Sequence, residues 1–279
     1  LMVVKFFGTE TNGASRWLDL GFMSFQPSEL AKVVFVMYLA KQLSLRQRNY
    51  VKIILAFVLI VGLIFVENGS TGLLLLITGL FICVIAEVSI PWKYLLAGIA
   101  VVSVLGVVLI QLDLLPRLDT WYNRFDRFFS GEADIQSDYA KIAVASGGLW
   151  GEGIGESDMK NFLPLSFADY IFAIILEEKG LFALIVSITV YGLLFKRIRD
   201  YALMCENRYE AYLLMGLSFM YTLQAVVHMF VNVGLFPVTG QTLPMVSWGG
   251  TSGIFVCMAY GTILSITHDI KQANKNKIE

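Results

Sequence analysis

Charged side chains inside apolar runs are the first places where this sequence could carry out chemistry. Glu29 and Lys32 stand three residues apart at the start of one such run, which puts them on one face of a helix. An ionisable residue is costly at membrane depth, so it is a candidate functional residue by default. The alternative is an ion pair that only makes insertion tolerable, and the spacing by itself favours that structural role.

Asp169 opens a second apolar run and is followed by a cluster of three charges. An acidic residue suits the first turn of a helix, and Ser166 lies at the spacing of a capping box, so helix-end electrostatics is the structural explanation for Asp169. Glu177, Glu178 and Lys179 lie about two to three turns deeper in the same predicted helix. Three consecutive charges cannot all face lipid, so we expect this helix to face protein or a wet cavity.

The third candidate is the segment 240–253, which is rich in glycine, proline and hydroxyl side chains between two apolar runs. Irregular backbone near membrane depth is tolerated where it lines a cavity or packs inside protein. A tight turn whose small residues allow close helix packing explains the composition equally well. His228 lies inside the preceding run, where we expect an interhelical hydrogen bond rather than a base or a metal ligand.

The composition indicates the elements that must position these residues. Hydrophobic residues make up 57% of the chain and charged residues only 15%, a balance typical of a membrane protein rather than a soluble one. The net charge of −1 gives no basic excess for nucleic acid, so no such partner is expected. We predict an all-α, polytopic transmembrane helix bundle. Its seven predicted spans are 27–45, 51–66, 71–90, 92–112, 169–195, 209–233 and 250–268.

Basic residues in the connecting segments predict the orientation of these spans. They gather at alternate loops and in the C-terminal tail, so all these groups can be cytoplasmic at once. They are Arg46, Arg48, Lys52, Lys93, Lys196, Arg197, Arg199, Arg208, Lys271, Lys275 and Lys277. The C-terminus is therefore predicted to be cytoplasmic, and the long loop 113–168 extracytoplasmic. Leu1 is not a native start, so we expect either a missing upstream piece or a start at Met2.

Three blocks of sequence resemble the signatures of the SEDS family (FtsW/RodA/SpoVE). The first block comprises 13–18 and 25–32, the second 163–180 and the third 237–252. They occur in the order found in the family and on the same predicted side of the membrane, and the resemblance covers nearly the whole chain. Family members have ten spans. The resemblance therefore implies a single membrane domain over 1–279 that lacks the first three spans.

The resemblance implies a peptidoglycan glycosyltransferase that polymerises lipid II in the bacterial cytoplasmic (inner) membrane. The chain resembles division-type members most, and these make septal cell wall. The partners that this resemblance implies are a class B penicillin-binding protein transpeptidase, other divisome proteins and membrane lipid. An elongation-type polymerase, a lipid II flippase and a non-catalytic divisome scaffold are the alternatives. Phe167 and Ala168 depart from the family pattern, which often has a polar pair before the aspartate.

The same resemblance assigns roles to individual residues. Asp169 matches the essential aspartate of the family, and we expect it to be the catalytic base. No metal ligand is predicted and no cofactor is certain, although a divalent cation, Mg or Mn, is compatible with a diphosphate leaving group. The residues expected to bind substrate are Arg16, Gln26, Ser28, Glu29, Lys32, Lys160, Glu178 and Ser247.

Overall fold

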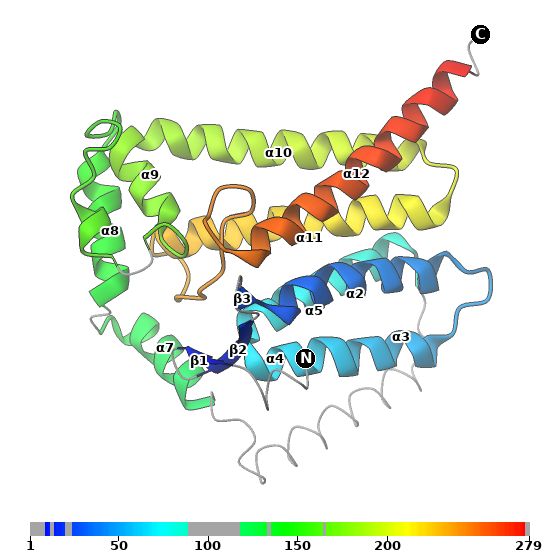
Figure 1. The fold of residues 1–279 in the computed structure, drawn as a ribbon, viewed down its shortest axis with the longest axis horizontal. Helices are drawn as coiled ribbons and strands as arrows, with labels where there is room; N and C mark the ends of the chain where they lie inside the picture. Colours follow the sequence, from blue (N-terminus) through cyan, green and yellow to red (C-terminus); the bar gives the residue numbers. More distant parts are fainter. Residues whose placement is uncertain are drawn as a thin grey trace. The chain divides into compact units, whose positions relative to one another are not determined.

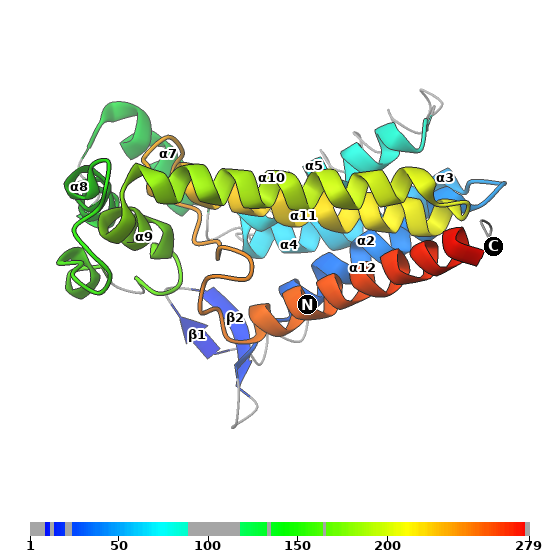
Figure 2. The ribbon, with the colours of Figure 1, turned by 90° about the horizontal axis from the view of Figure 1, so that it is seen from above.

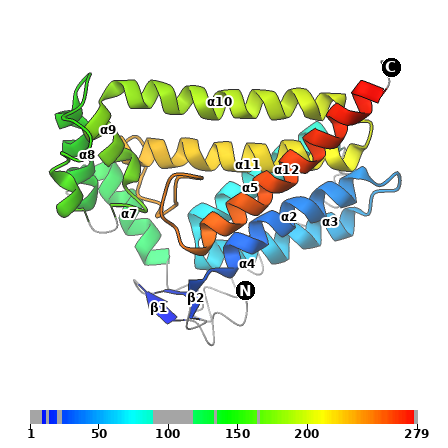
Figure 3. The same cartoon turned by 45° about the horizontal axis from the view of Figure 1, so that its top comes forward.

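The computed structural model describes residues 9–11, 14–19, 24–88, 118–132, 135–163 and 166–276 (Figure 1). The chain forms two compact units. Unit 1 comprises Leu1–Arg117, Arg197–Met220 and Gly250–Glu279, and unit 2 comprises Leu118–Lys196 and Tyr221–Gly249. The helices α10 (Leu181–Met204) and α11 (Arg208–Asn232) contribute residues to both units and run side by side in Figures 1, 2 and 3.

Unit 1 begins with a small antiparallel sheet in the order β1-β2-β3. Its strands are β1 (Thr9–Thr11), β2 (Ala14–Asp19) and β3 (Ser24–Phe25). The sheet leads directly into α2, which starts with a proline at its first position, where the missing N–H costs no helical hydrogen bond. The described helices of unit 1, besides parts of α10 and α11, are α2 (Pro27–Ser44), α3 (Tyr50–Ala56), the π-helical turn η1 (Phe57–Val61), α4 (Gly62–Glu67), α5 (Gly69–Ile85) and α12 (Thr251–Asn276).

Small residues let the helices of unit 1 approach closely. A methyl group on Gly79 would lie 2.5 Å from the ring of Phe57, and Phe57 meets Phe35 edge to face with ring centroids 5.4 Å apart. A methyl group on Gly216 of α11 would lie 2.7 Å from Val36 of α2. Close backbone approach at small residues is a usual way for membrane helices to pack without a hydrophobic driving force.

Unit 2 carries the rest of the described helices around two apolar clusters. They are α7 (Leu118–Ser130), α8 (Ile135–Gly147), the 3-10 turn η2 (Met159–Asn161) and α9 (Ile171–Lys179), with parts of α10 and α11. Phe172 and Leu176 of α9 pack in one cluster with Tyr191 of α10 and Met229 of α11. This cluster fixes α9 against the two long helices.

The predicted span 169–195 is wrong as a single helix. Gly180 separates α9 from α10 with a φ of 65°, a conformation that strongly favours glycine. A methyl group there would lie 2.5 Å from the backbone of Leu149, and the last carbonyls of α9 accept hydrogen bonds from the amides of Glu152 and Gly153. The charges at 177–179 therefore belong to the short helix α9 rather than to the apolar helix Leu181–Met204.

The helical membrane class is confirmed. Four of the described helices are long and apolar enough to cross a membrane: Tyr50–Glu67, Leu181–Met204, Arg208–Asn232 and Thr251–Asn276. Gly69–Ile85 is a shorter apolar helix, and α2 follows the predicted run 27–45 closely. The predicted span 92–112 lies outside the described residues. The short sheet of β1, β2 and β3 was not predicted.

Candidate active site

Asp169 lies in the turn that leads into α9, and its side chain is partly exposed. The helix begins two residues later at Ile171, and its N-cap position is Tyr170, which makes no side-chain capping bond. The hydroxyl of Ser166 donates instead to the carbonyl of Lys160 at 3.3 Å. The capping-box explanation for Asp169 is therefore wrong, and other contacts hold this turn in place.

Asn232, at the end of α11, provides the first of those contacts. Its side chain is fully buried. The amide oxygen accepts from the backbone N–H of Ala173 at 2.9 Å, and the amide nitrogen donates to the carbonyl of Asp169 at 3.2 Å and to that of His228 at 2.9 Å. One side chain thus joins the backbone on both sides of the start of α9 to α11.

The segment 237–249 provides the second set of contacts. The hydroxyl of Ser247 donates to the carbonyl of Ala168 at 2.7 Å and accepts from the amide of Leu243 at 2.7 Å. The amide of Trp248 donates to the carbonyl of Phe167 at 3.0 Å. A methyl group on Gly240 would lie 3.7 Å from Oδ2 of Asp169, so this segment passes beside the carboxylate itself.

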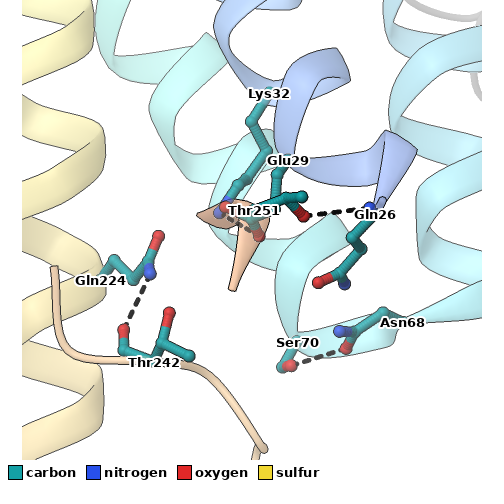
Figure 4. A network of polar contacts seen from close by, with 8 residues as sticks. All are labelled: Gln26, Glu29, Lys32, Asn68, Ser70, Gln224, Thr242 and Thr251. Carbon is teal, nitrogen blue, oxygen red and sulfur yellow. Dashed lines mark hydrogen bonds and ion pairs between the residues drawn. The ribbon is translucent and has the colours of Figure 1, made fainter. Parts of the chain in front are cut away.

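The irregular backbone of this segment is satisfied by side chains of three helices. Arg124 of α7 donates to the carbonyl of Val238 at 3.0 Å, and Tyr191 of α10 donates to that of Pro244 at 2.5 Å. His228 of α11 lies 2.7 Å from the carbonyl of Gln241, and Gln224 donates to that of Thr242 at 2.8 Å (Figure 4). Buried backbone carbonyls need such partners, and here they fix an otherwise unsupported turn. His228 is a hydrogen-bonding residue, as predicted, although its partner is this turn rather than another helix.

Glu177 is buried and accepts hydrogen bonds that stabilise the neighbouring turn. Its side chain is 1% exposed, and its carboxylate accepts from the Ser157 hydroxyl and from the amides of Asp158 and Met159, both at 3.2 Å. It therefore caps the turn η2 rather than lining a path across the membrane. The expectation that 177–179 lie deep in a span is corrected accordingly.

Two of the predicted substrate-binding residues in unit 2 contact the loop before α9. The ammonium of Lys160 donates to the carbonyl of Gly155, and the Lys160 side chain is exposed. The carbonyl of Glu178 accepts from the amide of Gly153 at 3.1 Å, and its side chain is partly buried. Ser247 reaches the turn that carries Asp169, because its hydroxyl donates to the carbonyl of Ala168.

In unit 1 the structure forms the Glu29–Lys32 ion pair, with 2.9 Å between Oε1 and Nζ (Figure 4). Both residues are buried, at 7% and 2% exposure. The amide of Gln26, just before α2, donates to the hydroxyl of Thr251 at 3.2 Å, and Ser28 lies in the first turn of α2 with its side chain partly buried. Arg16 lies on β2, and its side chain is outside the described part of the structure.

Asn232 is the residue that the sequence analysis missed. An amide at the end of a predicted span, next to a glycine-rich turn, was the available signal, but its partners lie 59 and 63 residues away along the chain. For the described residues, no group of three or more His, Cys, Asp or Glu side chains could hold a metal ion.

Together, the apolar helices, the buried ion pair and the carboxylate held beside an irregular turn define a multi-pass helical membrane protein with a candidate acid–base site. The family model for the FtsW/RodA/SpoVE cell cycle proteins matches residues 1–272. The chain belongs to this family, which confirms the resemblance of its three sequence blocks.

Individual relatives agree with that assignment. A probable peptidoglycan glycosyltransferase FtsW of Coxiella burnetii is 33% identical over 96% of this chain and 75% of its own length. Stage V sporulation protein E of Bacillus subtilis is 32% identical over 96% of this chain and 78% of its own.

Solved structures show the same fold. One chain, from the work described as "Structural coordination of polymerization and crosslinking by a peptidoglycan synthase complex", aligns with a TM-score of 0.73 and 28% identity over 97% of this chain and 78% of that one. The rod shape determining protein RodA of Thermus thermophilus aligns with a TM-score of 0.66 and 27% identity over 96% of this chain and 74% of its own.

Proposed function

We propose that this protein is a peptidoglycan glycosyltransferase of the division type, which polymerises lipid II into glycan strands for the septum. The observation that carries the proposal is the placement of Asp169, whose backbone is held by the buried Asn232 and whose neighbour Ala168 is held by Ser247. Relatives named probable peptidoglycan glycosyltransferase FtsW, at 29% to 33% identity, support the same reaction class.

In this reaction Asp169 acts as the general base. The 4-hydroxyl of the acceptor GlcNAc attacks the anomeric carbon of the donor MurNAc, and its proton passes to the Asp169 carboxylate. The new bond joins that oxygen to the anomeric carbon, while the bond from the same carbon to the diphosphate breaks. Its electron pair leaves with undecaprenyl diphosphate. A single displacement inverts the donor from the α to the β configuration.

The fixed backbone around Asp169 suits this role, because a base must stand within hydrogen-bond reach of the hydroxyl that it deprotonates. Errors of about 1 Å in placing a reacting group can cost about 100-fold in rate. Asn232, Ser247 and the amide of Trp248 all bond to the main chain between Phe167 and Ala173, and the Asp169 side chain is partly exposed. Asn232 and Ser247 are therefore positioning residues.

The leaving diphosphate needs cationic partners, and Arg16 and Lys32 are the proposed ones. A guanidinium offers a bidentate fork to phosphate oxygens, whereas an ammonium acts as a point charge. Glu29 holds the ammonium of Lys32 at 2.9 Å, so that charge is fixed in place but partly compensated. Lys160 is a weaker third candidate because its ammonium is already bonded to Gly155 in an exposed loop. A Mg or Mn ion on the diphosphate would share this charge neutralisation.

The proposed topology places the loop 113–168 outside the cytoplasm and the C-terminus inside it. The same orientation lets the protein work with a class B penicillin-binding protein transpeptidase and other divisome proteins. A structural neighbour from a peptidoglycan synthase complex supports a partner of that kind. An impermeant thiol reagent should label Glu156→Cys in intact spheroplasts, because Glu156 is exposed in this loop.

A lipid II flippase is the competing proposal, and the position of the charged cluster 177–179 in the structure argues against it. It needs a polar path across the bilayer, for which the cluster 177–179 was the sequence evidence. Glu177 instead caps η2, and α9 ends before the apolar helix begins.

The test is polymerisation of lipid II by purified protein carrying Asp169→Asn, with Asp158→Asn as the matched control. Asp158 is an exposed aspartate of the same unit, and its side chain makes no capping bond. We expect Asp169→Asn to abolish polymerisation and Asp158→Asn to keep it. Near-normal polymerisation by Asp169→Asn would overturn the general-base assignment and return the flippase and the scaffold to consideration.

A further inference from the structure

Helix α7 presents an aromatic face on which most side chains are exposed. At about 100° per residue, its five aromatic positions fall within an arc of about 120°, and its polar positions from 120 to 130 fall in the rest of the circle. The aromatic positions are Trp121, Tyr122, Phe125, Phe128 and Phe129. Tyr122 is 71% exposed, Phe125 53% and Phe129 80%. A helix with one apolar face and one polar face is typical of a position between an apolar medium and water.

The polar side of α7 is tied to the active-site turn. Arg124, at the edge of the aromatic arc, donates to the carbonyl of Val238 at 3.0 Å. Val238 belongs to the segment 237–249, which passes beside the Asp169 carboxylate at Gly240 and bonds to Phe167 through Trp248. Figures 1 and 2 place α7 at the same end of unit 2 as α8 and α9.

We propose that α7 is an interfacial helix, which lies on the outer surface of the bilayer with its aromatic face at the boundary between headgroups and acyl chains. Through Arg124 it holds the turn beside Asp169 at that depth. The proposed binding of α7 to lipid depends only on the exposed side chains of α7. Its role in setting the depth of Asp169 rests on the proposed function. The bond broken in that reaction joins a sugar to a lipid diphosphate, so it must lie at headgroup level.

Two observations favour a lipid surface over a protein partner for this face. Unit 2 exposes apolar side chains along the candidate membrane span α10, where Phe182 is 63% exposed and Ile185 58%. The face of α7 is rich in aromatic rings, including Trp and Tyr, which concentrate at membrane interfaces. Its charged residues from 120 to 130, Arg124, Asp126 and Arg127, all lie outside the aromatic arc, as an interfacial helix requires.

The test measures the depth of single nitroxide labels on the full chain in vesicles of phosphatidylethanolamine and phosphatidylglycerol. Labels at Phe125→Cys and Phe129→Cys report the aromatic face, and labels at Asn123→Cys and Arg127→Cys are the matched controls on the polar face. The native cysteines Cys83, Cys205 and Cys257 are replaced by alanine in all four variants.

We expect oxygen to relax the two aromatic-face labels more than a water-soluble nickel chelate does, and the reverse order for the two controls. Equal access of the nickel chelate to all four labels would place α7 in water and overturn the proposal. Exclusion of both reagents at 125 and 129 would mean a protein cover instead of lipid, and would overturn it as well. These spectra do not depend on catalysis, so their outcome is separate from that of the Asp169→Asn assay.

A second measurement addresses the role in depth. Phe125→Asp combined with Phe129→Asp should lower polymerisation in the same vesicles about tenfold relative to Asn123→Asp combined with Ser130→Asp, because small displacements of a reacting group are costly. Equal rates for the two double variants, in protein whose labels had shown lipid contact, would remove the depth role.

Discussion

The two acidic residues that stand out in the sequence, Glu29 and Asp169, are held in opposite ways. Glu29 pairs with Lys32 within one turn of the regular helix α2. Asp169 lies in an irregular turn whose backbone is held by Asn232 and whose neighbour Ala168 is held by Ser247, 79 residues away along the chain. A local pair can satisfy a buried charge by itself, whereas the backbone at Asp169, the proposed base, is fixed by elements far away along the chain.

The difference separates stability from catalysis. Burial of both Glu29 and Lys32 makes their pairing a condition for inserting α2, because an uncompensated buried charge is strongly destabilising. The contacts around Asp169 use backbone groups and leave its carboxylate partly exposed. Perturbing the first region should therefore reduce folded protein, and perturbing the second should reduce turnover.

The largest effect is expected from Glu29→Ala. The variant leaves the ammonium of Lys32 buried without its carboxylate and should lower the free energy of unfolding by about 3–5 kcal/mol. Thermal melting in detergent, followed by intrinsic fluorescence, measures the loss. Lys52→Ala, which removes an exposed lysine, is the control and should melt like the unmodified protein.

The double variant Glu29→Ala with Lys32→Met sharpens this result. Replacing both charges by apolar groups should restore most of the melting temperature, because no buried charge remains. If Lys32 also neutralises the leaving diphosphate, the restored protein should still polymerise lipid II slowly. Full activity in the restored protein would limit this pair to a structural role.

Asn232→Ala should have the next largest effect, with turnover rather than folding as its main readout. It removes three hydrogen bonds from the start of α9 and the end of α11, and should lower kcat about 100-fold with little change in KM. Asn232→Asp keeps an acceptor for the amide of Ala173. Its kcat should therefore lie between that of the unmodified protein and that of Asn232→Ala. Asn161→Ala, at an exposed site of the same unit, serves as control. A raised KM with an unchanged kcat would contradict a positioning role.

Ser247→Ala should have the smallest effect. The hydroxyl contributes one donated and one accepted bond, worth about 1 kcal/mol each, so turnover should fall about 30-fold. Ser247→Thr keeps the hydroxyl and should retain most of the rate. Ser146→Ala removes a hydroxyl that bonds only within its own helix α8 and should leave turnover unchanged.

The same contrast explains how much of the molecule could be predicted. The spacing of Glu29 and Lys32 predicts their ion pair, because the feature is local. Apolar runs likewise predict both ends of α11 and the start of α12 to within a few residues. The break at Gly180 was not predictable, since glycine is common within membrane helices and its cause is the close approach of Leu149. The role of Asn232 depends on partners far along the chain, which periodicity does not reveal.

The most direct test of this account is a double-mutant cycle between Asn232 and Asp169 in the purified polymerisation assay. Asp169→Glu moves the carboxylate by one methylene and should retain about one hundredth of the rate, which is enough to measure. If Asn232 acts only by holding Asp169, adding Asn232→Ala to Asp169→Glu should change the rate little, because the base is already misplaced. Rates that multiply, with a double variant about ten-thousandfold below the unmodified protein, would show that Asn232 acts independently of Asp169 and contradict the account.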